Sequence, residues 1–189
     1  MTLRKRREMN LPDSVEKVLL GEHTIAARVE ELAAQISADY ADTDDLILVG
    51  VLKGSFIFLA DLARRLAVRH YVDFIALSSY NRGTANAGAV RLIMDTRMSV
   101  TGRHVLVVED ILDTGYTLHY LLRAFHARKP ASLRSCVLLS KPERREIEVP
   151  VDYLGFEIPD VWVVGYGLDY ADRFRTLPYI GTLRREVYE

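Results

Sequence analysis

Apolar residues recur along the first third of the chain in two alternating patterns. Across residues 24–40 they follow the helical spacing, which predicts an amphipathic helix with Ile25, Val29, Leu32, Ala33 and Ile36 on its apolar face. Residues 46–52 form a continuous apolar run, which is typical of a strand buried on both faces of a parallel sheet. Lys53-Gly54-Ser55 ends this run. A second helix is predicted up to Arg69, with an apolar stripe of Phe56, Leu59, Leu62, Ala63 and Leu66.

The alternation continues through the rest of the chain. Further strands are predicted at residues 72–79, 105–108, 135–139 and 161–166, and a helix before Pro130 has the apolar stripe Leu118, Leu121, Leu122 and Phe125. Strands that alternate with helices predict an α/β fold with a mainly parallel, doubly wound sheet flanked by helices, and ligands bind such sheets at the carboxyl ends of the strands. Residues 81–89 are small and polar, so we expect a mobile loop that can serve as a lid.

Composition narrows the class of protein. The 189 residues include 25 Lys and Arg against 26 Asp and Glu, and 49% are hydrophobic, which fits a single globular domain spanning residues 1–189. A net charge of −1 disfavours bulk binding of nucleic acid, since phosphate neutralisation needs a basic face. Cys136 is the only cysteine, which excludes an intramolecular disulfide and suits a reducing cytoplasm. No run of about 18 apolar residues occurs, so we expect a cytoplasmic protein without a membrane span.

The segment most informative about chemistry follows the strand predicted at residues 105–108. Glu109 and Asp110 come first, then Asp113, and then Thr114-Gly115-Tyr116-Thr117, which opens a helix. Backbone N–H groups at a helix N-terminus bind anions, so this string predicts a phosphate cradle. Carboxylates beside a phosphate must face sugar hydroxyls, a divalent cation or a proton to be abstracted. The alternative is structural, with the first two carboxylates ending a strand and Thr114 capping the helix. The Gly-Lys-Ser/Thr element of a Walker A loop is missing.

The string from Glu109 to Thr117 resembles the phosphoribosyl-diphosphate signature of the type I phosphoribosyltransferases, and the fuller match is to their hypoxanthine or hypoxanthine-guanine branch. The resemblance extends over residues 46–180 and includes Leu52-Lys53-Gly54-Ser55, Ser79-Tyr80, Lys141, the run from Val161 to Tyr170, and Arg175. It implies the type I fold, in which a small hood subdomain accompanies the doubly wound sheet.

The resemblance also implies roles on the phosphate side of the site. Glu109 and Asp110 would hold the ribose hydroxyls, and Asp113, Thr114, Gly115, Tyr116 and Thr117 would bind the 5′-phosphate. Asp113 would also act as general base or acid at purine N7. Lys53 and Gly54 would receive pyrophosphate in a loop with a cis peptide between Leu52 and Lys53, and Arg175 would be a further pyrophosphate ligand. Tyr116 departs from the family, because some members have lysine there.

On the purine side, Lys141 would donate to the 6-oxo group, Trp162 would stack on the base, and Val163 would complete the pocket. For Trp162, a place in the core is an equal alternative. Asp169 would bind Mg²⁺, with Glu109 and Asp110 as further metal ligands. Ser79 and Tyr80 would precede the loop that closes over the reacting centre.

The resemblance thus implies a Mg²⁺-dependent purine salvage enzyme. Its substrates would be phosphoribosyl diphosphate and a 6-oxopurine, either hypoxanthine or guanine, and it would form a homodimer or homotetramer. One alternative is a regulatory RNA-binding protein on the same fold, which would need a basic face such as a patch formed by residues 4–7 and Arg184-Arg185. Another is a nucleotide-binding module without activity, which the intact carboxylates disfavour.

Overall fold

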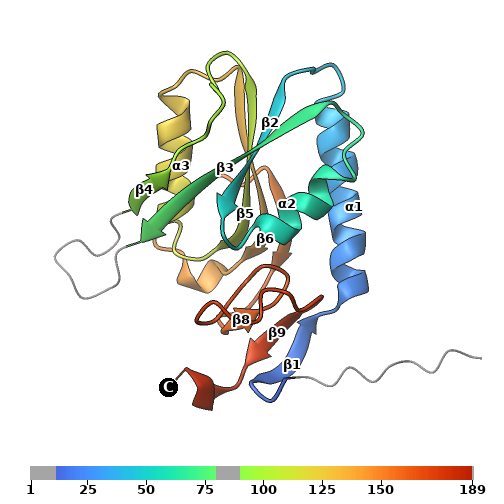
Figure 1. Ribbon diagram of the computed structural model, residues 1–189, viewed down its shortest axis with the longest axis vertical. Coiled ribbons are helices and arrows are strands. Elements are labelled where there is room, and N and C mark those ends of the chain that lie inside the picture. Colours follow the sequence, from blue (N-terminus) through green and yellow to red (C-terminus); the bar gives the residue numbers. More distant parts are fainter. Residues whose placement is uncertain (1–11, 80–89, 189) are drawn as a thin grey trace, which may run out of the picture.

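The computed structural model describes residues 12–79 and 90–188 (Figure 1). The predictions for Tyr80, for the loop at 81–89 and for the basic residues 4–7 lie outside these ranges. Of Ser79, only the backbone is described. No helix in the described part of the chain is long and apolar enough to cross a membrane.

A six-stranded sheet in the order β4-β3-β2-β5-β6-β7 forms the centre of the molecule. Five of its strands are parallel, and one edge strand, β4, runs antiparallel to β3. The strands are β2 (Leu46–Leu52), β3 (His70–Ser79), β4 (Val90–Met94), β5 (His104–Leu112), β6 (Ser132–Ser140) and β7 (Tyr153–Glu157). The mainly parallel sheet is therefore confirmed, and β2 has the predicted bounds.

Helices cover both faces of this sheet (Figure 1). The helices α1 (Glu22–Asp39) and α2 (Phe56–Ala63) lie on one face, and α3 (Tyr116–His126) lies on the other. Successive residues of β2 point to opposite faces, so that Leu46 and Leu48 pack with α1 and α2 while Ile47 and Val49 pack with α3. This two-sided burial explains the continuous apolar run. The five predicted residues of the α1 face are all buried.

Three predicted elements differ most from the structure. Helix α2 ends at Ala63 rather than Arg69. Phe56, which was predicted on its apolar stripe, is 39% exposed, because the inward face of the helix begins at Ser55 and continues through residues 58, 59 and 62. Strand β5 runs on to Leu112, since its pairing with β6 continues to Ser140. The apolar run at 161–166 contains only a two-residue strand, because the positive φ of the glycine at 165 turns the backbone.

A second, three-stranded sheet lies beyond the carboxyl ends of the parallel strands, below them in Figure 1. It is antiparallel, in the order β1-β9-β8, and consists of β1 (Val15–Leu20), β8 (Val163–Val164) and β9 (Ile180–Leu183). This sheet corresponds to the expected hood. Two short 3₁₀ turns, η1 (Pro142–Arg144) and η2 (Arg185–Val187), follow β6 and β9. The interval between the two sheets is where the predicted site residues lie.

Candidate active site

Three segments meet at the carboxyl ends of β2 and β5. They are the loop after β2, the last residues of β5, and the hood segment 165–175. A Cβ atom added to Gly54 would lie 1.7 Å from Asp110 Oδ2, and one added to Gly167 would lie 2.0 Å from the carbonyl oxygen of Gly54. Gly54 is therefore enclosed between the Asp110 carboxylate and the hood backbone. The peptide bond between Leu52 and Lys53 is cis, as the resemblance implies.

The two cations predicted to bind pyrophosphate lie together beside this loop. Lys53 Nζ is 3.0 Å from Asp172 Oδ1, and Arg175 Nη2 is 3.0 Å from the same oxygen. Arg175 Nη2 also lies 2.7 Å from Asp169 Oδ1, and its Nη1 donates to the carbonyl oxygen of Gly167 at 2.8 Å. The structure thus brings Lys53, Asp169 and Arg175 together. Asp172, which the sequence did not single out, holds the two cations side by side.

Glu109 and Asp110 form an acidic pair at the end of β5. Burial raises the pKa of Glu109 well above its ordinary value, and the neighbouring Asp110 carboxylate adds to this rise. Burial also raises the pKa of Asp110, to about 6, although backbone hydrogen bonds and Arg175 oppose the rise and Asp169 adds to it. Glu109 Oε2 is buried and has no hydrogen-bond partner within the described residues. The Glu109 carboxylate therefore retains acceptor capacity for a ligand.

The predicted phosphate cradle is the N-terminus of α3. Gly115 is the N-cap with φ 98°, and a Cβ there would lie 2.4 Å from the carbonyl oxygen of Ile147. The carbonyl oxygen of Thr114 accepts the N–H groups of Glu146 and Ile147 at 3.0 Å each, which fixes the turn. No side chain caps the helix, so the structural alternative in which Thr114 caps it is wrong. Its first-turn N–H groups have no intrahelical acceptor and can bind an anion.

The residues predicted to contact the purine lie around η1. Lys141 is buried. Its backbone N–H donates to the carbonyl oxygen of Leu112 at 3.0 Å, which places Lys141 beside Asp113. Arg144 Nε lies 2.6 Å from Asp113 Oδ1. Lys141 Nζ and Arg144 Nη1 each lie 3.5 Å from Asp160 Oδ1. The structure therefore joins the two predicted purine contacts through Arg144 and Asp160, neither of which was predicted.

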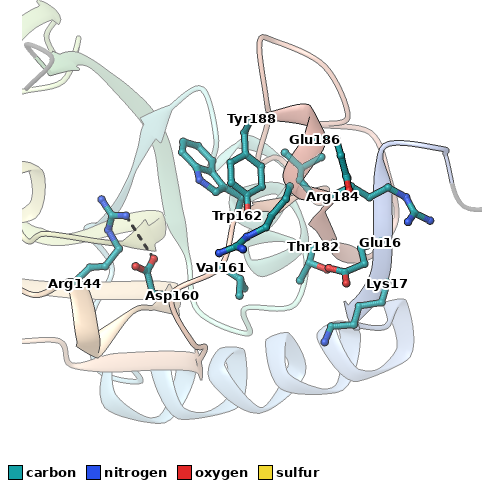
Figure 2. A pocket seen from close by; sticks show the side chains of 12 residues that line it. Glu16, Lys17, Arg144, Asp160, Val161, Trp162, Thr182, Arg184, Glu186 and Tyr188 are labelled. Atoms are coloured by element: carbon teal, nitrogen blue, oxygen red, sulfur yellow. Dashed lines mark hydrogen bonds and ion pairs between the residues drawn. The ribbon is translucent and has the colours of Figure 1, made fainter.

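Trp162 projects from the hood and is 49% exposed, so its alternative place in the core is wrong. Its ring lies 5.5 Å from that of Tyr188 and 6.1 Å from that of Tyr170, measured between centroids. Figure 2 shows Trp162 and Tyr188 at a cavity of about 540 Å³ that Arg144 and Asp160 also line. Val163, the next residue, is buried in the core between hood and sheet. An exposed indole next to a cavity is available to stack on a planar ligand.

A family model described as a phosphoribosyl transferase domain matches residues 17–171. The chain belongs to this family. It is 47% identical over 175 residues to the hypoxanthine-guanine phosphoribosyltransferase of Bacillus subtilis, covering 93% of this chain and 97% of the relative. It is 49% identical over 166 residues to the hypoxanthine phosphoribosyltransferase of Escherichia coli, covering 87% and 93% of the two chains.

Solved phosphoribosyltransferase structures share the fold. That of the Trypanosoma cruzi hypoxanthine phosphoribosyl transferase superposes with a TM-score of 0.89 at 45% identity, covering 94% of this chain and 96% of the other. That of the Staphylococcus aureus hypoxanthine phosphoribosyltransferase gives 0.90 at 44% identity, covering 96% and 100%. The predicted fold class, a doubly wound sheet with a hood, is thereby confirmed.

The carboxylates of this phosphoribosyltransferase offer the oxygen donors that Mg²⁺ prefers, and they would share the ion with a phosphate-bearing ligand. Within residues 12–79 and 90–188, no three metal-ligating side chains gather into one cluster. Glu109 nevertheless leaves a buried oxygen without a partner, and Asp169 lies near Asp110. Mg²⁺ prefers oxygen ligands, retains several waters, and is usually bound by one or two carboxylates plus phosphate oxygens. This donor set suits that mode of binding and would not suit an all-protein metal cage.

Proposed function

We propose that this phosphoribosyltransferase works in purine salvage, transferring the phosphoribosyl group of 5-phosphoribosyl 1-diphosphate to hypoxanthine to give IMP and pyrophosphate. Guanine, which would give GMP, is the second candidate base. The observation that carries the proposal is the buried Lys141 beside Asp113, at the ends of adjacent strands. A cationic donor next to a carboxylate complements the 6-oxo group and the N7 proton of a 6-oxopurine. A 6-amino purine presents a donor to Lys141 instead.

In the proposed reaction, Asp113 accepts the proton from N7 of the purine. Loss of the N7 proton leaves electron density on the purine ring, so that N9 becomes a better nucleophile. N9 then forms a bond to the anomeric carbon, and the bond from that carbon to the pyrophosphate oxygen breaks with both electrons going to pyrophosphate. The protein supplies positions and charges and forms no covalent intermediate.

In this proposal, each part of phosphoribosyl diphosphate has a separate binding place. The N-terminus of α3, from Asp113 to Thr117, would bind the 5′-phosphate. Glu109 and Asp110 would accept hydrogen bonds from the ribose hydroxyls, and the unpartnered Oε2 atom of Glu109 supports this role. Lys53, Gly54 and Arg175 would bind pyrophosphate. Trp162 would stack on the base beside Val163.

The proposed metal is Mg²⁺, with Asp169, Glu109 and Asp110 as the residues that would hold it. When bound, it would neutralise part of the negative charge that develops on pyrophosphate. Ser79 and Tyr80 complete the proposed substrate contacts. We further propose that residues 1–189 act as one domain, that the protein assembles as a homodimer or homotetramer, and that it is cytoplasmic. The RNA-binding alternative finds no support in the relatives named above.

The proposal is tested by steady-state assays with Mg²⁺-phosphoribosyl diphosphate and hypoxanthine, guanine, xanthine or adenine in turn. Pyrophosphate release should depend on the base, and hypoxanthine should support turnover whereas adenine should not. Reactions without a base measure hydrolysis and serve as the control. Efficient turnover of adenine would move the protein to another branch of the family, and no turnover with any purine would reject the function.

A further inference from the structure

Asp160 lies in the turn between β7 and β8, outside every motif of the family resemblance. The N–H of Ile158 donates to the carbonyl oxygen of Ser140 at 2.9 Å, and the N–H of Val161 donates to that of Pro159 at 2.9 Å. The turn is therefore fixed to the residue that precedes Lys141. Because Ile158 lies two residues before Asp160 and Ser140 directly precedes Lys141, this hydrogen bond keeps the Asp160 carboxylate close to the lysine.

Asp160 belongs to a row of alternating charges that links the two proposed purine contacts. The row runs from Lys141 through Asp160 and Arg144 to Asp113. Figure 2 shows the contact between Arg144 and Asp160 at the wall of the cavity. The side chain of Lys141 is 9% exposed, whereas that of Asp160 is 40% exposed. The carboxylate thus lies at the boundary between the buried ammonium group and solvent.

A buried ammonium group is costly unless an opposite charge compensates it. Within the described residues, Asp160 forms the only ion pair of Lys141. At 3.5 Å this contact is longer than a good N–H···O hydrogen bond, so it attracts the ammonium group without occupying its donors fully. The N–H groups stay available to a carbonyl oxygen. An incoming 6-oxo group is such an acceptor.

We propose that Asp160 is a positioning residue for 6-oxopurine recognition: it holds the Lys141 ammonium group where that group donates to the 6-oxo oxygen. The inference rests on the proposed function and extends it to a residue that does not contact the base. The rival role of Asp160 is to hold Arg144 against Asp113. That role would affect proton transfer at N7 and would be insensitive to the 6-oxo group.

Binding of three ligands to Asp160→Asn separates these roles. IMP carries the 6-oxo group, purine riboside 5′-monophosphate lacks it, and ribose 5-phosphate lacks the base. Calorimetric titration should show IMP affinity reduced by roughly tenfold, the effect expected when a charged hydrogen-bonding partner is misplaced. Affinity for the other two ligands should change by less than about twofold. Asp160→Glu keeps the charge and should recover most of the IMP affinity.

Two further variants sharpen the test. Glu157→Gln removes an exposed carboxylate three residues away and should leave all three affinities unchanged. Asp160→Asn introduced into Lys141→Met should cause no further loss of IMP affinity, because the lysine that it positions is gone. A further loss in that background would overturn the inference.

The outcomes also separate this inference from the proposed function. If the unmodified protein binds IMP no more tightly than ribose 5-phosphate, the proposed function fails. If the unmodified protein discriminates between them but Asp160→Asn keeps full IMP affinity, the positioning role is wrong. An equal loss for all three ligands would show that Asp160 maintains the fold of the site as a whole, which also overturns the inference. If Asp160→Asn fails to fold, the same three titrations are performed with Asp160→Ser.

Discussion

Replacing Gly54 by alanine should displace the Asp110 carboxylate from the proposed ribose site. The new Cβ would lie 1.7 Å from Asp110 Oδ2 and 2.4 Å from its Cγ. An ordinary contact needs about 3.4 Å, so the carboxylate must retreat by roughly 1.5 Å. The φ of Gly54 is not in the left-handed region, so the effect is one of space rather than of backbone conformation. A misplacement of about 1 Å in a site can cost about 100-fold in rate, or about 2.7 kcal/mol of transition-state stabilisation.

The assay is kcat/KM for phosphoribosyl diphosphate at saturating hypoxanthine, together with a thermal melt to confirm folding. We expect a decrease of about 100-fold for Gly54→Ala. Gly21→Ala is the matched control, because a Cβ at Gly21 meets no atom within 4 Å. If the loss acts through Asp110, then Asp110→Ala should add little to it. A folded Gly54→Ala variant with kcat/KM within about threefold of the unmodified protein would refute the steric argument.

Three further predictions concern the acidic groups and Lys141. Asp113→Asn should slow turnover by about 10² to 10⁴ while leaving the binding of phosphoribosyl diphosphate nearly intact, and near-normal turnover would remove Asp113 from the role of base. Lys141→Met should reduce kcat/KM for hypoxanthine by more than about tenfold while purine riboside 5′-monophosphate still binds, and equal losses for both would contradict its role at the 6-oxo group. Burial raises the pKa of Asp110 to about 6, so the folded state gains stability from this group at low pH and loses it as the pH rises through 6. Asp110→Asn should therefore raise the Tm of the ligand-free protein at about pH 8 and not below about pH 4, and a gain independent of pH would contradict this.

The sequence predicts the elements in which a clear apolar pattern matches the buried surface. The inner face of α1 follows from its apolar periodicity, because this helix packs on one face of the sheet. The bounds of β2 follow from its continuous apolar run, because this strand is buried on both faces. Strands β1, β4, β7 and β9 were not predicted. Strands β1, β4 and β7 lie at sheet edges, and the burial of β1 and β7 is only partial. Strand β9 is buried, but it has only four residues, and a glycine and a threonine interrupt its apolar pattern. Helix α2 was predicted too long, since Leu66 packs against the core from a position after the helix has ended.

The candidate site shows a comparable division. The run from Glu109 to Thr117 could be singled out because carboxylates followed by the start of a helix carry the chemistry. Lys53-Gly54 could be singled out because of the resemblance to the family. Arg144, Asp160 and Asp172 could not, because an isolated arginine or aspartate in a polar segment has no distinguishing pattern. The positions of Asp160 and Asp172 depend on how the β7–β8 turn and the hood fold back on the strand ends, which is a property of the tertiary structure.

Asp160 and Asp172, which the sequence did not single out, each lie between two cations, but their ion pairs differ in exposure and therefore in effect. Asp172 lies between Lys53 and Arg175, and Asp160 lies between Lys141 and Arg144. The side chains of Lys53 and Asp172 are 68% and 69% exposed, so their ion pair contributes little to stability, and in the proposed function pyrophosphate would replace it at small cost. Lys141 is almost fully buried, and removing the Asp160 carboxylate would leave the charge of the lysine uncompensated. In the proposed function, the carboxylate between two cations would therefore be exchanged for a ligand on the phosphate side, whereas on the purine side it would hold a lysine in a fixed orientation.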